Sequence, residues 1–195
     1  MSPRATYLLN YGAYQLGWLA AILGAAAGYG TAGASTGFAL TAGHVLLARD
    51  RRGELTLVVV SLVCGVAVES WQIASGTYRV LAAASPGGLP PLWLLALWAQ
   101  FATTFRFSLR RIMTAPRSAL VFGALGGPIA FLAGERLGAV VLEVPLGPGL
   151  ARLVVAWAVA LATLAWGARR LKAPAEGYRS MTGRSSRLPR SSAPT

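Results

Sequence analysis

The sequence predicts an all-α protein, a polytopic transmembrane bundle of six helices with a disordered C-terminal tail. Two observations support this fold class. Hydrophobic residues make up 55% of the 195 residues and charged residues only 12%, whereas about a quarter of a typical soluble domain is charged. The basic residues also occur in short blocks separated by long uncharged stretches. This pattern is typical of membrane helices joined by charged loops.

Each predicted span has close to the length that a membrane requires. A helix rises about 1.5 Å per residue, so roughly 20 apolar residues cross a hydrocarbon core of about 30 Å. The predicted spans are residues 5–28, 31–48, 55–75, 92–109, 118–134 and 150–167. The second span is the weakest because it is short and rich in Gly, Ser and Thr. Only Tyr29 and Gly30 separate it from the first, so we expect a tight helical hairpin there.

The positions of Arg and Lys predict the orientation. Of the 18 basic residues, 15 fall at the termini and in alternate loops that would share one side of the membrane. The other three are Arg79, Arg136 and Arg152. Cytoplasmic loops carry the excess of basic residues, so we expect a multi-pass protein of the bacterial cytoplasmic (inner) membrane with both termini in the cytoplasm. The basic blocks are assigned to topology and to contact with anionic membrane lipids, and no nucleic-acid partner is expected.

The chain divides into a transmembrane domain at residues 1–172 and a tail at residues 173–195. The tail is rich in Ser, Pro and Arg and has no apolar periodicity, so we expect a disordered basic cytoplasmic segment. Cys64 is the only cysteine and His44 the only histidine. Because a disulfide needs two cysteines and a His/Cys zinc site needs several ligands, neither is expected, and no cofactor is predicted.

One group of polar residues falls near the predicted outer interface. Glu69 and Gln72 share a face of the third span, and Glu135 and Arg136 end the fifth at a similar height. A carboxylate inside the membrane is costly, so Glu69 is a candidate site residue that would pair with Arg136 or with Arg79. The alternative is that Glu69 and Gln72 reach interfacial water and have no functional role.

A second polar group falls toward the cytoplasmic side. It consists of Asn10, Gln15, His44, Gln100, Thr103 and Thr104. In a continuous fourth helix, Gln100, Thr103, Thr104 and Phe107 would form one stripe that faces the bundle interior. These groups are candidate ligand-binding residues, and the alternative is that they form hydrogen bonds between helices. His44 is interpreted as a packing residue, because the sequence shows no partner carboxylate near it.

Three segments resemble a family of small multi-pass bacterial inner-membrane proteins that is known only as a domain of unknown function. The segments are Asn10-Tyr11-x3-Gln15-x-Gly17-Trp18, Leu92-Trp93-x3-Ala96-x4-Phe101-Ala102-Thr103-Thr104 and Gly123-x2-Gly126-Gly127-Pro128 through Gly134-x2-Leu137-Gly138-Ala139. The resemblance implies multi-pass membrane residence, no defined activity, and a gene context of lipid modification and oxidative stress. It also implies polar residues between Thr104 and Ser108, where this chain has Phe105-Arg106-Phe107.

The polar residues leave three functional interpretations. The favoured one is a non-enzymatic membrane protein that binds a lipid or small amphiphile, or that holds a lipid-modifying enzyme or another membrane protein. The second is a small transporter or permease with Glu69 as its coupling group. The third is an intramembrane enzyme with Glu69, His44 or Glu135 as its base. The sequence contains no P-loop, G-x-S-x-G or H-E-x-x-H motif, which makes the enzyme the weakest of the three.

Overall fold

The computed structural model describes residues 2–81 and 89–170, and these residues are predominantly helical. The helices are α1 (Pro3–Ala26), α2 (Gly30–Leu47), α3 (Arg51–Ala74), α4 (Leu92–Ala102), α5 (Arg110–Met113), α6 (Pro116–Arg136) and α7 (Leu146–Arg170). The two short strands are β1 (Tyr78–Val80) and β2 (Val140–Leu142), and they pair antiparallel with Arg79 opposite Val141. The predicted tail, residues 173–195, lies outside the described residues.

The all-α class is confirmed, but the six-span arrangement is not. Three helices, α3, α6 and α7, are both long and apolar enough to cross a membrane. The helices α1 and α2 have 24 and 18 residues, and Gly, Ser, Thr and amide side chains interrupt their apolar stretches. The fourth predicted span is too long: α4 has 11 residues and ends at Ala102 rather than at Leu109.

The early end of α4 has a visible cause in its side chains. The hydroxyls of Thr103 and Thr104 bond the carbonyls of Gln100 and Phe101, three residues before each. The backbone N–H groups of Thr103 and Thr104 bond the same two carbonyls, so the chain tightens into successive turns. The predicted stripe from Gln100 to Phe107 is therefore wrong beyond Thr104, because helical register does not continue to Phe107.

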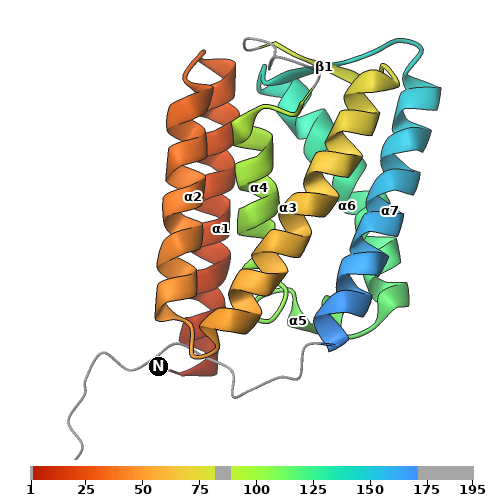
Figure 1. The fold of residues 1–195 in the computed structure, drawn as a ribbon. Helices are drawn as coiled ribbons and strands as arrows, with labels where there is room; N and C mark the ends of the chain where they lie inside the picture. The colour runs from red at the N-terminus through yellow and green to blue at the C-terminus, as the bar shows by residue number, and fades with distance from the viewer. Residues whose placement is uncertain (1, 82–88, 171–195) are drawn as a thin grey trace, which may run out of the picture.

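The short α4 occupies the centre of the fold. Figure 1 shows α4 between the pair α1–α2 and the pair α6–α7, with α3 crossing in front of it. Eight of its 11 residues are buried. The pair α6–α7 packs closely because Gly123 and Gly127 lie against Trp157, and a Cβ at Gly123 would stand 2.3 Å from the Trp157 carbonyl oxygen.

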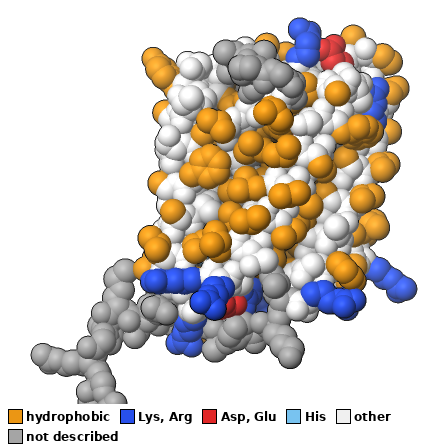
Figure 2. Space-filling model, viewed as in Figure 1, with side chains coloured by type: hydrophobic (Ala, Val, Ile, Leu, Met, Phe, Trp, Pro, Cys, Tyr) orange, Lys and Arg blue, Asp and Glu red, His pale blue; other side chains and the backbone are white. Residues whose placement is uncertain are grey.

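The two ends of the bundle differ. The start of α1, the helix α5 and the end of α7 lie at one end, and the strands β1 and β2 lie at the other (Figure 1). Lys and Arg side chains gather at these ends, while the visible face between them is apolar or uncharged (Figure 2). We call the end with α5 the lower end and the end with the strands the upper end.

Candidate functional site

One face of α3 holds a central tryptophan of α4. Ser61, Gly65 and Glu69 follow each other at intervals of four residues, so they form one row on the helix. The Ser61 hydroxyl donates to the Trp98 carbonyl at 2.8 Å. A Cβ at Gly65 would lie 2.5 Å from the Trp98 ring, so only glycine lets the indole lie here. The Trp98 indole N–H donates to Glu69 Oε1 at 2.8 Å.

Glu69 is fully buried, with 0% of its surface exposed. Its second oxygen, Oε2, accepts a hydrogen bond from the Tyr78 hydroxyl at 2.6 Å. Burial is the largest cause that raises the pKa of Tyr78, and the charge of Glu69 and the hydrogen bond to Glu69 raise this pKa further. The phenol therefore stays protonated and donates. The expected pairing of Glu69 with Arg136 or Arg79 is wrong. Arg79 pairs with Glu143 instead, because the β1–β2 register brings them together.

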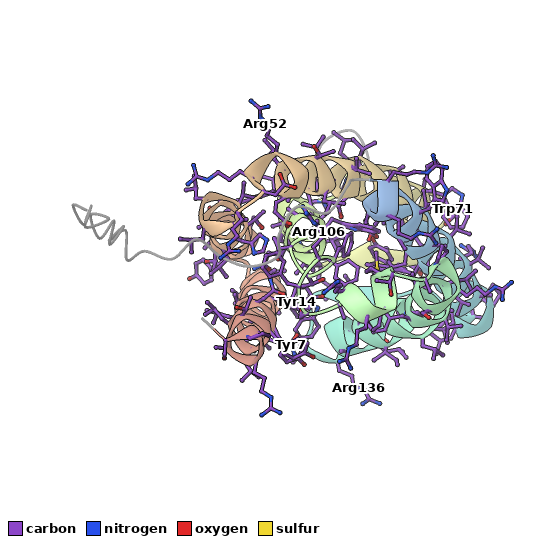
Figure 3. The ribbon with its side chains drawn as sticks, turned by 90° about the horizontal axis from the view of Figure 1, so that it is seen from below. Tyr7, Tyr14, Arg52, Trp71, Arg106 and Arg136 are labelled. Atoms are coloured by element: carbon purple, nitrogen blue, oxygen red, sulfur yellow. The ribbon has the colours of Figure 1, made fainter. Side chains whose placement is uncertain are left out.

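Of the other predicted residues at the upper end, Gln72 shares the buried face of α3 with Glu69 as expected, while in the described residues no hydrogen bond or ion pair joins Glu135 or Arg136 to Glu69. Gln72 is fully buried, and neither atom of its amide group has a hydrogen-bond partner among the described residues. Glu135 accepts a hydrogen bond from the Leu142 N–H at 2.8 Å and so ties the end of α6 to β2. Arg136 is exposed and points away from the bundle in Figure 3.

A cavity of about 350 Å³ lies among α1, α4, α6 and α7, with Glu69 in its wall. We call it the main cavity. It is lined by α1 from Tyr11 to Ile22 and by α6 from Phe122 to Gly134, so it extends roughly 17 Å along the bundle at the rise of a helix. Near the upper end α1 and α6 approach each other, since a Cβ at Gly134 would lie 3.7 Å from Ile22 Cδ1. Below this point the main cavity lies between residues of α1 and residues of α6.

The wall of the main cavity is aromatic and apolar. Trp18, Trp93, Trp98, Phe131 and Trp157 contribute to it, and the Trp98 and Trp157 rings stack with centroids 4.7 Å apart. Among the described residues that line it, Glu69 is the sole Asp, Glu, Lys, Arg or His. The indole N–H groups of Trp93 and Trp157 have no hydrogen-bond partner in the described residues. The cavity thus combines an apolar body with one carboxylate.

The predicted polar residues toward the lower end separate into two groups. Gln15 and Thr104 line the main cavity, as does Tyr14, which precedes Gln15 on α1 and points toward the interior in Figure 3. The others line a second cavity of about 200 Å³ between α1, α2 and α4; these are Asn10, His44, Gln100 and Thr103. The sequence predicted one polar group at this end, with Gln100, Thr103 and Thr104 on one stripe, and did not separate the residues between two cavities.

Asn10 is a structural residue at the break after α4. Its amide donates to the Thr103 carbonyl at 3.0 Å, and its side-chain oxygen accepts from the Ser108 N–H at 3.2 Å and the Ser108 hydroxyl at 2.6 Å. Backbone groups freed by a helix break must be satisfied inside a membrane protein, and here a neighbouring helix satisfies them.

A buried ionic network near the lower end was missed by the sequence analysis. His44 Nε2 lies 3.0 Å from Glu54 Oε2, and Arg106 Nη1 lies 3.1 Å from Glu54 Oε1 and 2.9 Å from Asp50 Oδ2. Glu54 is 2% exposed and His44 8%. Arg106 lies inside the ring of helices, whereas Arg52 points outward (Figure 3). We call these four residues the lower network.

The expectation that His44 has no nearby carboxylate is wrong. The short α2–α3 connection folds Glu54 back onto His44, ten residues earlier in the chain. A signal for this was present, because Glu54 lies seven residues before Ser61 on the buried face of α3. Arg106 supplies a polar side chain between Thr104 and Ser108, where the family resemblance implied one.

Asp50 connects the lower network to the start of α3. Its Oδ1 accepts a hydrogen bond from the Gly53 N–H at 3.1 Å, which caps the helix. That hydrogen bond and the Arg106 guanidinium hold the pKa of Asp50 below its ordinary value of 3.8. Among the described residues, no group of three or more His, Cys, Asp or Glu side chains is placed to bind a metal ion.

Comparison with known proteins assigns the chain to a family without a defined function. No curated protein and no solved structure matches the sequence. The family described as "Protein of unknown function (DUF2878)" matches residues 7–163, which is most of the chain. The protein therefore belongs to the DUF2878 family.

Proposed function

We propose that this protein is a non-enzymatic, multi-pass protein of the bacterial cytoplasmic membrane that binds a lipid or small amphiphile in the main cavity. The observation that carries this proposal is the main cavity itself, an aromatic-walled space of about 350 Å³ that contains a single carboxylate. Small-molecule sites are mostly apolar cavities of roughly 300–1,000 Å³ with a few placed polar groups, and the main cavity fits that description.

The polar groups of the main cavity suit an amphiphile better than a pure hydrocarbon. Glu69 accepts hydrogen bonds, and the unpartnered N–H groups of Trp93 and Trp157 are donors. Unsatisfied polar groups are costly when buried, and a bound molecule with its own polar group would reduce that cost. Both α1 and α6 line the main cavity, and the proposal has the molecule enter sideways from the lipid between these two helices.

The charge distribution supports the proposed orientation, with both termini in the cytoplasm. The start of α1 and the end of α7 both lie at the lower end, where Arg110, Arg111 and Arg117 also occur. Basic residues favour the cytoplasmic side of a membrane protein. With the lower end in the cytoplasm, Glu69 would lie five residues, or about 8 Å, before the outer end of α3.

Native mass spectrometry of the full chain in mild detergent tests the proposal. A Cβ at Gly126 would have only the Phe122 ring near 4 Å, so the phenyl ring of Gly126→Phe should fill part of the main cavity without displacing a helix. Gly12 lies on the exposed side of α1 with nothing within 4 Å of its Cβ position. We expect a co-purified amphiphile on the natural protein and on Gly12→Phe, and its loss from Gly126→Phe. Equal occupancy in all three proteins would refute the proposal.

A second candidate function is transport. The observation that favours it is Glu69, a fully buried carboxylate in a cavity wall, because such groups couple ion and substrate movement in transporters. Proton-linked flux in liposomes that is lost in Glu69→Gln would support transport over binding alone. A scaffold role beside a lipid-modifying enzyme or another membrane protein would instead give a stable complex without flux.

A further inference from the structure

We infer that the ligand of the main cavity is a lipophilic organic cation, an amine or quaternary ammonium with an apolar group, whose charge lies beside Glu69. This inference rests on the proposed binding function and adds the charge of the ligand to it. Two features of the cavity wall point to a cation: the absence of any basic side chain among its described residues, and the aromatic rings around the carboxylate.

In the described part of the chain, Glu69 accepts hydrogen bonds but has no cationic partner. The Trp98 N–H and the Tyr78 hydroxyl each donate to one of its oxygens. Among the described residues, the ion pairs involve other carboxylates, those of Asp50, Glu54 and Glu143. A buried carboxylate without a cationic partner is costly, and a positively charged ligand would offset this cost.

The rings beside Glu69 suit a cation as well. The Tyr78 and Phe131 centroids are 4.7 Å apart, and Phe131 lies edge-on to Trp157 at 6.3 Å. Trp98, Phe131 and Trp157 line the main cavity, and Tyr78 connects Phe131 to Glu69 through its ring contact and its hydroxyl. Aromatic faces attract ammonium groups, most strongly where water is excluded, and quaternary ammonium sites are commonly built from such rings.

The same wall disfavours phospholipids. A phosphate beside Glu69 would place a second negative charge in a cavity whose described lining contains no Lys, Arg or His. Like charges close together in a low-dielectric site repel strongly. The lining therefore favours an amine over a phosphate as the group beside Glu69.

Isothermal titration calorimetry of the full chain in a non-ionic detergent tests the inference with two molecules of nearly equal shape. The probes are benzyltrimethylammonium and its uncharged carbon analogue neopentylbenzene. In Glu69→Gln, the amide oxygen can still accept from Trp98, and the Tyr78 hydroxyl can turn to accept from the amide nitrogen. This variant therefore removes the charge while keeping the packing. Glu143→Gln removes a carboxylate outside the main cavity and is the matched control.

We expect the cation to bind the natural protein and Glu143→Gln equally, and to bind Glu69→Gln at least tenfold more weakly. Gly126→Phe, which keeps Glu69, should also bind the cation at least tenfold more weakly because the space is filled. Equal binding of cation and neutral analogue, unchanged in Glu69→Gln, would overturn the inference but leave the proposed amphiphile site intact. Failure of both probes, with the same co-purified material on Gly126→Phe and Gly12→Phe, would overturn both.

Discussion

Trp98 and Glu69 are joined by a hydrogen bond of 2.8 Å from the indole Nε1 to Oε1, and Gly65 lies beneath the indole one helical turn before Glu69. This relationship connects α4 to α3 and fixes a carboxylate in the wall of the main cavity. Trp98 is 2% exposed and Glu69 is 0% exposed. The hydrogen bond therefore connects α4 to α3 and also fixes the position of Glu69 in the cavity wall. Separate experiments can test these two roles.

Trp98→Phe should destabilise the protein. The phenyl ring fills most of the indole space but cannot donate, so Glu69 Oε1 is left without its partner. An unsatisfied buried acceptor costs about 1–3 kcal/mol, and more if it is charged. The melting temperature in detergent should fall clearly. Trp71→Phe is the control, because Trp71 lies on α3, the helix of Glu69, but is 49% exposed. An equal fall in both variants would contradict the assigned role of Trp98.

Gly65→Ala should have a comparable effect through packing. The new methyl group would stand 2.5 Å from Cγ of Trp98, inside the distance that atoms tolerate, so the indole must move. Overpacking of this kind costs about 1–3 kcal/mol. Gly126→Ala should be nearly neutral, because the nearest atom to its Cβ position is 3.9 Å away. Comparison of the two melting temperatures checks the prediction, and equal stability would contradict it.

The helices were predictable where their evidence is local. The bounds of α1, α2, α3 and α6 follow the predicted spans within a few residues, because continuous apolar stretches between charged or turn residues determine them. The end of α4 was not predictable in this way. The Thr103 and Thr104 hydroxyls bond the preceding turn locally, but the Thr103 carbonyl is satisfied by Asn10, 93 residues earlier in the chain.

The candidate site was predictable in its residues and not in its contacts. A carboxylate within an otherwise apolar helix is conspicuous in the sequence, so Glu69 could be selected from the sequence alone. Its partners could not, because Tyr78 follows the end of α3 in a short strand and Trp98 comes from α4. The lower network shows the same limit, since Arg106 resembles other loop arginines until the fold places it between two carboxylates.

Reporter fusions should give a fixed topology. We expect cytoplasmic signals for fusions after Arg52, Arg117 and Lys172, and periplasmic signals near Gly87 and Val144, because 15 of the 18 basic residues then face the cytoplasm. Paired alkaline phosphatase and green fluorescent protein fusions measure this. A periplasmic signal after Lys172 would contradict the proposed orientation.

Asp50 should make stability depend on pH in the acid range. Its pKa in the folded protein is below the ordinary 3.8, so the unfolded chain binds more protons between these two values. The stabilisation from Asp50 is therefore complete above the ordinary pKa and is lost as pH falls through the folded value. Natural protein should exceed Asp50→Asn in melting temperature at about pH 6, and the difference should shrink toward about pH 3. A difference that does not change with pH would contradict this.

Arg106→Met should be the most destabilising of these changes. It removes the cation shared by Asp50 and Glu54 and leaves two carboxylates close together, one of them only 2% exposed. Breaking a buried ion pair costs about 3–5 kcal/mol, and the lower figure applies here because the Arg106 side chain is 13% exposed. Melting temperature and folded yield in detergent measure the effect. Arg52→Met, at an outward-facing position on α3, should leave both unchanged.

The charge explanation for Arg106 can be separated from simple loss of packing. Removing the two carboxylates in the same background, as Asp50→Asn with Glu54→Gln, should recover part of the stability lost in Arg106→Met, because the repulsion disappears while the smaller side chain remains. Such coupling between contacting residues is the quantity that a mutant cycle measures. If the triple variant is no more stable than Arg106→Met alone, the aliphatic stem of Arg106 stabilises the lower end by packing, and its guanidinium does not act as the shared cation of the lower network.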